Sequence, residues 1–358
     1  MSRFRQLMIA NQGSKYPANA TVWEVTIPEG GANYQFFIRN RSSSSVVDWG
    51  DGSVETISAT GDRSPAHTYP AGSYTVSLTG TYDLVHIGSG NATYGKLVTR
   101  LVQVSEELTD YSSLCKYCAI TELPAGFTIP YGVTTVSGMF ESCKIPYLPE
   151  GFSLPETVIR MDRMFYAGGL KEIPDSFYLN NNIQQASNVF WVIGGLSTDV
   201  AKFFGAITSD SELRNVSAMF GVTGVYGTVP LNSLTAITSL SATTNCFLNC
   251  TKLTNFTELP PSWGGGKVIL ENQTITTSAT IDAVIAKINE NYAAYAYQYD
   301  VKFTSANMPE GLTLNYNWST NPSNCKLQGT LPAGTYTFDV TLSNKWSSAT
   351  ATITLIVK

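Results

Sequence analysis

The stretch "SGMFESC" at residues 137–143 recurs along the chain, and its recurrence decides the fold. Related stretches are "SSLCKYC" at 112–118, "MDRMFYAGG" at 161–169, "ASNVFWVIGG" at 186–195, "VSAMFGVTG" at 216–224 and "TTNCFLNC" at 243–250. A second pattern recurs in the same register, as "ITELPAGFTIP" at 120–130, "IPYLPEGFSLP" at 145–155 and "LKEIPDSFYLN" at 170–180. Self-similarity at a period of this length is typical of an array of structural repeats.

One position is shared by all six stretches, and we call it the ladder position. Each repeat is too small to bury an apolar side alone, so repeats of this kind must stack on one another. Stacking places the same position of every repeat in one column. The shared position is Cys115 in the first repeat, and we expect the five that follow to form one buried core ladder of Phe140, Phe165, Phe190, Phe220 and Phe247.

The cysteines of the first two repeats allow two interpretations. Cys115 and Cys118 have the C-x-x-C spacing of zinc and redox sites, and Cys143 follows in the next repeat. No second C-x-x-C or ligating histidine accompanies them, however. The position three residues after the ladder accepts Cys, Gly, Ile or Thr, which indicates a small, semi-buried slot. We therefore expect these cysteines to be reduced, metal-free packing residues.

The repeats resemble the BspA-type leucine-rich repeats and the related "M-F-x-x-C" repeats of bacterial surface and phage proteins. The resemblance covers about residues 100–265 and implies a solenoid over 99–296. "STDVAKFFGAI" at 197–207 departs from the pattern and predicts a short helix. Apolar residues at helical spacing further predict an amphipathic capping helix over 278–294, with Ile281, Val284, Ile285, Ile288 and Tyr292 on one face.

The segment before the repeats has the alternation of β-strands. "SSVVDWGDGSVETI" at 44–57 predicts a hairpin, and "GSYTVSLTG" at 72–80 predicts a further strand of a small β-sandwich around Trp49. The combination of "WGDG" and "HTY" resembles the polycystic-kidney-disease (PKD) type of immunoglobulin-like domain, over residues 18–98. Asp48 and Asp51 then have two readings, as cation ligands or as residues of the hairpin turn.

The C-terminal segment, residues 297–358, ends in two alternating strands, "GTYTFDV" and "ATITLIV". It resembles the Ig-like modules of bacterial and phage surface proteins. Because it is short for an immunoglobulin sandwich, either the preceding segment lends a strand or the module is trimmed. The fold class predicted for the whole chain is mainly β and multidomain, with an N-terminal extension at 1–17.

Composition excludes several classes of function. Only 14% of the residues are charged and the net charge is −5 with no basic run, which argues against nucleic-acid binding. No segment is apolar and long enough for membrane insertion. The two histidines, His67 and His86, fit no catalytic motif, and no cofactor is expected. We expect a protein that is not an enzyme.

The modules together predict a structural or adhesive protein. We expect a bacteriophage virion component, such as a fibre, decoration or tail-associated protein, that binds other virion proteins or a host-surface glycan or protein. We expect assembly in the host cytoplasm, because no signal peptide, lipobox or sorting tail is recognised. The oligomeric state is left open, with a homo-oligomer as one alternative. A bacterial cell-surface adhesin is the alternative, and a glycan-active enzyme is a distant third.

The N-terminal extension is a candidate anchor. Phe4, Leu7, Met8 and Ile9 precede any recognised domain, so they are apolar residues without a core of their own. They would either dock the protein onto a larger assembly or pack back on the PKD-like domain as an edge strand.

Overall fold

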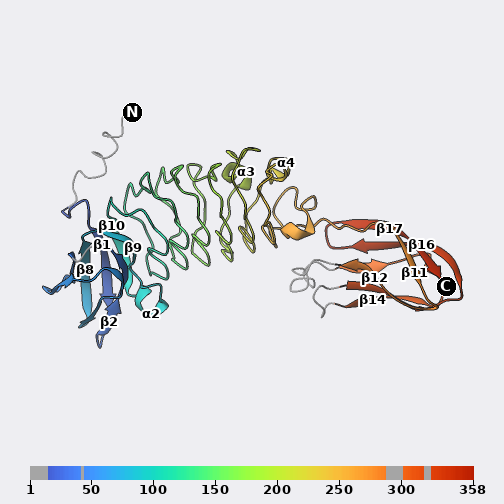
Figure 1. The fold of residues 1–358 in the computed structure, drawn as a ribbon, viewed down its shortest axis with the longest axis horizontal. Helices are drawn as coiled ribbons and strands as arrows, with labels where there is room; N and C mark the ends of the chain where they lie inside the picture. The colour runs from blue at the N-terminus through green and yellow to red at the C-terminus, as the bar shows by residue number, and fades with distance from the viewer. Residues whose placement is uncertain (1–14, 42–43, 288–300, 318–323) are drawn as a thin grey trace. The chain divides into compact units, whose positions relative to one another are not determined.

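Strands account for most of the regular structure in the computed structural model, which describes residues 15–41, 44–287, 301–317 and 324–358 (Figure 1). The chain divides into two compact units, Met1–Ala242 and Thr243–Lys358. Helical turns in the described part of the chain are short. They are α2 (Ala92–Gly95), α3 (Val200–Phe203), α4 (Leu231–Thr235) and the 3-10 turn η1 (Pro261–Trp263).

The first unit begins with antiparallel sheets. One sheet has the order β10-β1-β8-β4-β5, with β10 (Val98–Gln103), β1 (Thr21–Ile27), β8 (Gly72–Thr79), β4 (Ser45–Asp48) and β5 (Val54–Ile57). A second has the order β6-β3-β9, with β6 (Gly61–Arg63), β3 (Phe37–Asn40) and β9 (Tyr82–His86). β2 (Ala32–Gln35) pairs with β7 (Ala66–Tyr69). The predicted hairpin is confirmed, because β4 and β5 pair with Asp48 opposite Val54.

Aromatic side chains fill the space between these strands. Trp49 is 1% exposed, and its ring lies 5.6 Å from that of Phe36, which in turn lies 5.3 Å from Trp23. The Tyr69 hydroxyl donates to the Trp49 carbonyl at 2.8 Å, which satisfies a polar group in this core. The alternating pattern of the sequence therefore marked the inward-facing side chains correctly here.

The first repeat packs directly on these strands. The Ile87 N–H donates to the Leu114 carbonyl at 2.9 Å, and the Ala119 N–H donates to the Val98 carbonyl at 2.9 Å. Gly95 allows the close approach, because a Cβ at this position would lie 2.7 Å from the Tyr117 carbonyl oxygen. The N-terminal sheets thereby cover the exposed end of the repeat stack.

Successive repeats of the first unit form coils that lie side by side (Figure 1). A chain of parallel bridges joins Asp110, Thr135, Arg160, Gln185, Asn215 and Ala242, one from each coil. From Cys115 through Phe190, the N–H of the ladder residue donates to a carbonyl of the following coil, as from Phe140 to Met164 at 2.9 Å and from Phe165 to Val189 at 2.9 Å. The coils are thus joined through backbone groups in the register that the sequence repeat predicts.

Phenylalanine rings fill the interior of the coils. Along the ladder, ring centroids are 5.6 Å apart for Phe140–Phe165, 5.7 Å for Phe165–Phe190 and 5.1 Å for Phe190–Phe220, all stacked. The phenylalanines of the Leu-Pro pattern, Phe127, Phe152 and Phe177, form a second column beside the first, which Phe203 of α3 continues. Phe247 is buried in the second unit, where it stacks on Trp263 at 6.4 Å. The short helix predicted near Val200 is confirmed by α3.

Residues with a left-handed backbone conformation recur on both sides of each ladder residue. In every coil the residues two before and two after the ladder position have φ between 51° and 65°. In the first unit these are Ser113 and Tyr117, Gly138 and Ser142, Arg163 and Ala167, Asn188 and Val192, and Ala218 and Val222. From Ser113 through Val192, each of these residues donates its N–H to the next coil. Only one of the ten is glycine, although the left-handed conformation costs other residues about 1–2 kcal/mol each.

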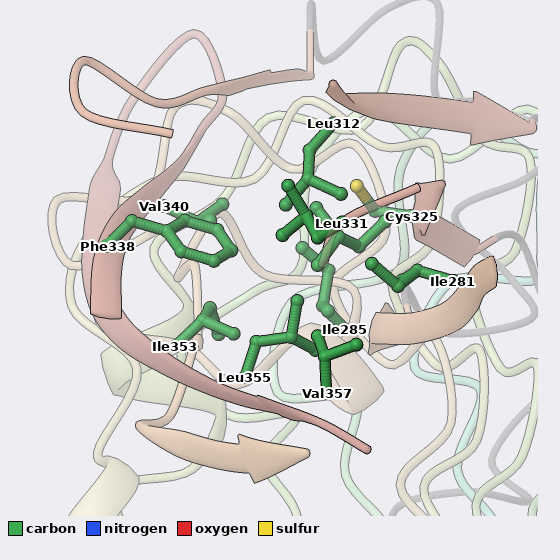
Figure 2. Packing of buried hydrophobic residues seen from close by; sticks show 11 residues of the cluster. Ile281, Ile285, Leu312, Cys325, Leu331, Phe338, Val340, Ile353, Leu355 and Val357 are labelled. Carbon is green, nitrogen blue, oxygen red and sulfur yellow. The ribbon is translucent and has the colours of Figure 1, made fainter. Parts of the chain in front are cut away.

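The second unit contains two sheets. One has the order β11-β17-β16-β13, with β11 (Gln273–Thr277), β17 (Ser348–Val357), β16 (Gly334–Ser343) and β13 (Lys302–Thr304). The other has the order β12-β15-β14, with β12 (Thr280–Lys287), β15 (Asn324–Thr330) and β14 (Leu312–Asn317). Figure 2 shows side chains of both sheets meeting in one core. β11 pairs in parallel with β17, so residues before 297 do lend a strand to the C-terminal module.

The capping helix predicted over 278–294 is wrong for the residues that the structure describes. Residues 280–287 form strand β12, which pairs with β15, and residues 288–294 lie outside the described part. Ile281 and Ile285 are both buried at 2% exposure, whereas Val284 is 40% exposed. A spacing of four residues fits a helix of period 3.6 and also a strand of period 2, and the β-branched side chains favour the strand.

A loop packs on the last repeat where the helix was expected. Residues 344–347 connect β16 and β17, and the ring of Trp346 lies 5.1 Å from that of Phe256. The Asn344 side chain and the Ser347 hydroxyl both donate to the Gly266 carbonyl, at 2.9 and 2.7 Å. These contacts satisfy backbone groups of the last repeat within the second unit.

Replacing Phe165 with alanine tests the ladder. Phe165 is 2% exposed and contacts the rings of Phe140, Phe177 and Phe190, so the truncation leaves a cavity. We expect the free energy of unfolding to fall by about 3–5 kcal/mol, measured by denaturant titration. Tyr178→Ala, at a side chain that is 44% exposed, is the control and should change it little. Equal effects of the two substitutions would contradict the buried ladder.

Replacing Val192 with glycine tests the left-handed backbone. Val192 has φ 62° and is 47% exposed, so glycine relieves strain and removes little packing. We expect the free energy of unfolding to rise by about 0.5–1 kcal/mol. Val54→Gly in β5, also at an exposed side chain, should instead lower it by about 0.5–1 kcal/mol. A loss of stability from both substitutions would show that Val192 is not strained.

Candidate binding surface

The hydrogen bonds between coils align a row of side chains on the repeats. The residue two after the ladder donates its N–H to the residue one after the ladder in the next coil. The pairs are Tyr117 to Glu141 at 2.8 Å, Ser142 to Tyr166 at 2.8 Å, Ala167 to Trp191 at 3.0 Å and Val192 to Gly221 at 3.0 Å. We call Lys116, Glu141, Tyr166, Trp191 and Gly221, which directly follow the ladder residues, the surface row.

A buried carboxylate lies near the start of the surface row. The Glu141 side chain is 2% exposed and accepts two hydrogen bonds from the Arg163 guanidinium, at 2.7 and 3.0 Å. The Lys116 ammonium lies 3.3 Å from the same carboxylate. Burial favours the protonated acid, but the hydrogen bonds and charges of Arg163 and Lys116 together outweigh burial and hold the pKa of Glu141 below its usual value. Three consecutive coils are joined by this one charged group.

Arg163 connects the carboxylate with an aromatic ring. Its guanidinium carbon lies 3.8 Å from the centroid of the Tyr166 ring, so the planar group stacks on that ring. The Arg163 side chain is nevertheless 43% exposed. A guanidinium has five N–H donors and two of them bond to Glu141. Arg163 therefore faces solvent with N–H donors that Glu141 does not use. Its contacts with Glu141 and Tyr166 hold the plane of the guanidinium in place.

Trp191 follows Tyr166 in the surface row. Its indole ring lies against Gly221 of the next coil so closely that no Cβ fits there. Glycine at 221 thus makes room for the indole, and Trp191 remains partly exposed. An indole that packs on the next coil and is partly exposed presents apolar area to solvent.

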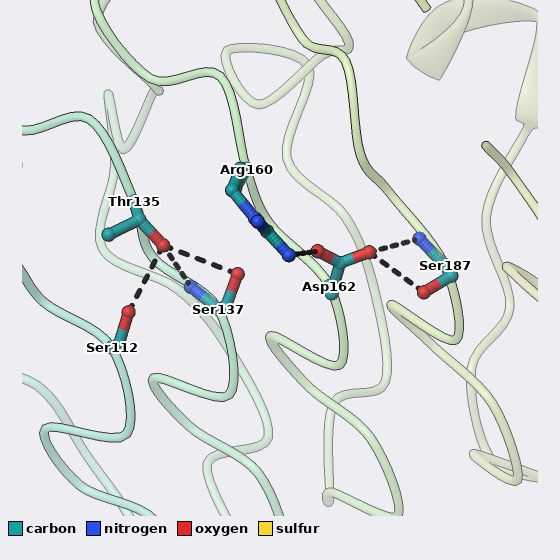
Figure 3. Close-up of polar contacts among 6 residues, drawn as sticks. All are labelled: Ser112, Thr135, Ser137, Arg160, Asp162 and Ser187. Carbon is teal, nitrogen blue, oxygen red and sulfur yellow. Dashed lines mark hydrogen bonds and ion pairs between the residues drawn. The ribbon is translucent and has the colours of Figure 1, made fainter. Parts of the chain in front are cut away.

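A second set of polar side chains forms an edge of the coils (Figure 3). Asp110 accepts from the Ser112 N–H at 2.8 Å, Thr135 accepts from the Ser137 N–H at 3.4 Å, and Asp162 accepts from the Ser187 N–H at 3.1 Å. Arg160 is paired with Asp162 at 3.4 Å. These side chains satisfy backbone N–H donors, within one coil for Ser112 and Ser137 and across adjacent coils for Ser187, so the edge has a structural role.

The cysteines are packing residues in the structure. Cys115, Cys118 and Cys143 are buried and free, and the Cys143 thiol donates to the Cys115 carbonyl at 2.8 Å. Burial raises the pKa of Cys143 to about 12 and places the pKa values of Cys115 and Cys118 well above their usual value. Among the described residues there is no group of three or more His, Cys, Asp or Glu side chains that could hold a metal ion.

The two aspartates of the predicted hairpin have partners within the turn. Asp48 accepts from the Gly50 N–H at 2.9 Å, and Asp51 accepts from the Ser53 N–H at 2.9 Å. Asp51 also lies 2.7 Å from His67 Nε2. The hydrogen bond with His67, followed by that from Ser53, lowers the pKa of Asp51 to about 2. These contacts match the hairpin-turn reading of both aspartates.

The second histidine, His86, is a packing residue. The His86 ring stacks on that of Phe37 at 5.1 Å, and burial lowers its pKa to about 4.

The residues predicted as an anchor, Phe4, Leu7, Met8 and Ile9, lie outside the described residues. In the described part of the chain, no helix has the length and apolar character that crossing a membrane requires.

The residues of the surface row were missed by the sequence analysis. The signal that could have found them is the position after each ladder residue, which holds Lys, Glu, Tyr and Trp in four successive repeats. Neither the side on which these residues lie nor the pairing of Glu141 with Arg163 follows from the repeat pattern alone. Both depend on the left-handed backbone conformations that recur on either side of the ladder position.

Comparisons with known proteins assign no family to the chain. No protein-family model matches the chain, and no curated protein sequence matches it. Among solved structures, it is similar to the functional domain of InlJ from Listeria monocytogenes, which includes a cysteine ladder. The identity is 11% and the TM-score 0.18, and the match covers 75% of this chain but only 59% of the InlJ chain. A similarity at this level assigns neither fold nor function.

Replacing Glu141 with glutamine tests the charged group. At pH 7 the substitution removes the ionised partner of Arg163 and Lys116, and we expect a loss of about 1–3 kcal/mol in the free energy of unfolding. Because the folded-state pKa of Glu141 is lowered, its contribution is complete above about pH 4.3 and is lost as the pH falls through the folded-state pKa.

The difference between wild type and Glu141→Gln should therefore shrink between pH 7 and pH 3, as measured by denaturant titration at each pH. Glu150→Gln, at an exposed carboxylate of the same repeat, serves as control. A difference that is independent of pH would contradict the lowered pKa.

Proposed function

We propose that the chain is a non-catalytic structural and adhesive protein, a bacteriophage virion component that presents its modules to a host-surface glycan or protein. The observation that supports this proposal is the surface row, in which charged and aromatic side chains are held in register by the backbone of stacked coils. An array of this kind offers an extended, rigid surface, which suits binding to a large partner.

The proposal includes a finer architecture. It places a leucine-rich-repeat-type solenoid between a PKD-type Ig-like domain and a C-terminal Ig-like module. The bridges between consecutive coils support the solenoid, and the hairpin around Trp49 supports the first Ig-like domain. The two sheets that enclose one core support the second Ig-like module.

The packing of the cysteines is compatible with a virion protein, to which a bacterial cell-surface adhesin is the alternative. All six cysteines of the chain are buried and free. Thiols persist in the reducing cytoplasm, where virions assemble, whereas exported proteins commonly form disulfides. Reduced packing cysteines are therefore compatible with assembly before release.

Immunogold electron microscopy of the producing culture tests this function. Antibodies against the purified chain should label phage particles released by lysis, and cells without phage should remain unlabelled. Label on the surface of uninfected cells would instead support the adhesin. Release of soluble sugar from purified capsule or cell wall by the isolated protein would contradict a non-catalytic role.

A further inference from the structure

We propose that the surface row binds an acidic polysaccharide, with a sugar carboxylate at Arg163 and Lys116 and a sugar ring on Trp191. The proposal rests on the proposed function and names the ligand class and the site. Two features of the surface row carry it, a surplus of positively charged donors and a partly exposed indole in the next coil.

The first feature is the charge of the cluster. Two cations, Lys116 and Arg163, share the single carboxylate of Glu141, which leaves a surplus of one positive charge in a chain of net charge −5. Three of the five guanidinium donors of Arg163 bond to no described residue, since Glu141 uses only two. A carboxylate of a ligand fits this arrangement, because a guanidinium binds carboxylates through paired parallel hydrogen bonds.

The second feature is the position of Trp191. Its indole lies on Gly221 and is partly exposed, and Trp191 occupies the coil after that of Arg163 and Tyr166. A sugar ring has an apolar face of C–H groups, and aromatic side chains supply matching apolar area with little entropy to lose. Adjacent coils are about 4.8 Å apart, so from Glu141 to Trp191 the surface row spans about 10 Å, enough for more than one sugar ring.

Preorganisation distinguishes this site from an ordinary surface ion pair. The left-handed φ of Arg163 is shared by the equivalent residues of the other coils, so the preorganisation comes from the contacts of its side chain. Here Glu141 and Tyr166 fix the guanidinium on two sides, so little side-chain entropy remains to be lost on binding.

A purely structural role for the cluster explains only part of these observations. Pairing between Lys116, Glu141 and Arg163 joins three coils and helps to fix their register. Such a role requires neither the surplus charge nor an aromatic face on Trp191, which takes no part in the ion pairs. An acidic glycan uses all of these groups together.

Isothermal titration calorimetry with the full chain tests the proposal. The probes are alginate, polygalacturonate and hyaluronan as acidic polysaccharides, dextran as the neutral one and poly-glutamate as an acidic peptide. We expect at least one acidic polysaccharide to bind at least tenfold more tightly than dextran and poly-glutamate. The affinity should fall at high salt, because the carboxylate contact is electrostatic.

Matched variants locate the binding site. Trp191→Ala and Arg163→Lys should each weaken binding at least tenfold, since the second keeps the charge but loses the planar donors. Trp191→Phe, which retains an aromatic face, should stay within about threefold of wild type. Tyr178→Ala, at an exposed tyrosine outside the surface row, should stay within twofold. Thermal melting of each variant identifies any loss that is due to unfolding.

Three outcomes would overturn the proposal. They are no binding to any of the three acidic polysaccharides, equal binding to dextran or poly-glutamate, and full binding by a folded Trp191→Ala variant. None of them bears on the immunogold labelling of particles, so a failure of this site and a failure of the virion assignment are distinguishable.

Discussion

The repeats depend on one constraint, which is that every backbone N–H near the ladder must find a carbonyl. Alternate N–H groups reach the next coil, as from Cys115 to Met139, and those between them close short turns within a coil, as from Lys116 to Ser113. This arrangement needs left-handed residues at fixed intervals. The strain of each is offset because unpaired buried backbone groups would cost more.

The same hydrogen bonds determine where side chains go. Ladder residues lie inside the coils, so phenylalanine rings stack and small cysteines fill the slots beside them. The residues that follow them are aligned in the surface row. Glu141 can therefore meet a lysine of the preceding coil and an arginine of the following coil, although these residues are far apart in sequence.

The sequence predicted the features that follow from periodicity. Steps of 25 to 30 residues located the ladder phenylalanines, and alternation located the hairpin at Asp48. The helix over 278–294 was wrong because Ile281 and Ile285 are four residues apart, a spacing that both helices and strands place on one face. The surface row was missed because apolar periodicity identifies inward positions and is silent on which polar residues meet. Glu141 and Arg163 meet because residues such as Ser142 and Arg163 are left-handed, and the sequence has no glycine at these positions to indicate it.

The repeats place the residues that stabilise the coils and the residues of the surface row at different positions. The ladder and the backbone hydrogen bonds hold the coils together, and they involve few of the outward side chains. Residues of the surface row can then differ from coil to coil, as Lys116, Tyr166 and Trp191 do, while the ladder hardly changes. Glu141 is the exception, because its carboxylate is buried and serves both purposes. A substitution there disturbs the register of three coils as well as the orientation of Arg163, whereas one at Trp191 leaves these ion pairs in place.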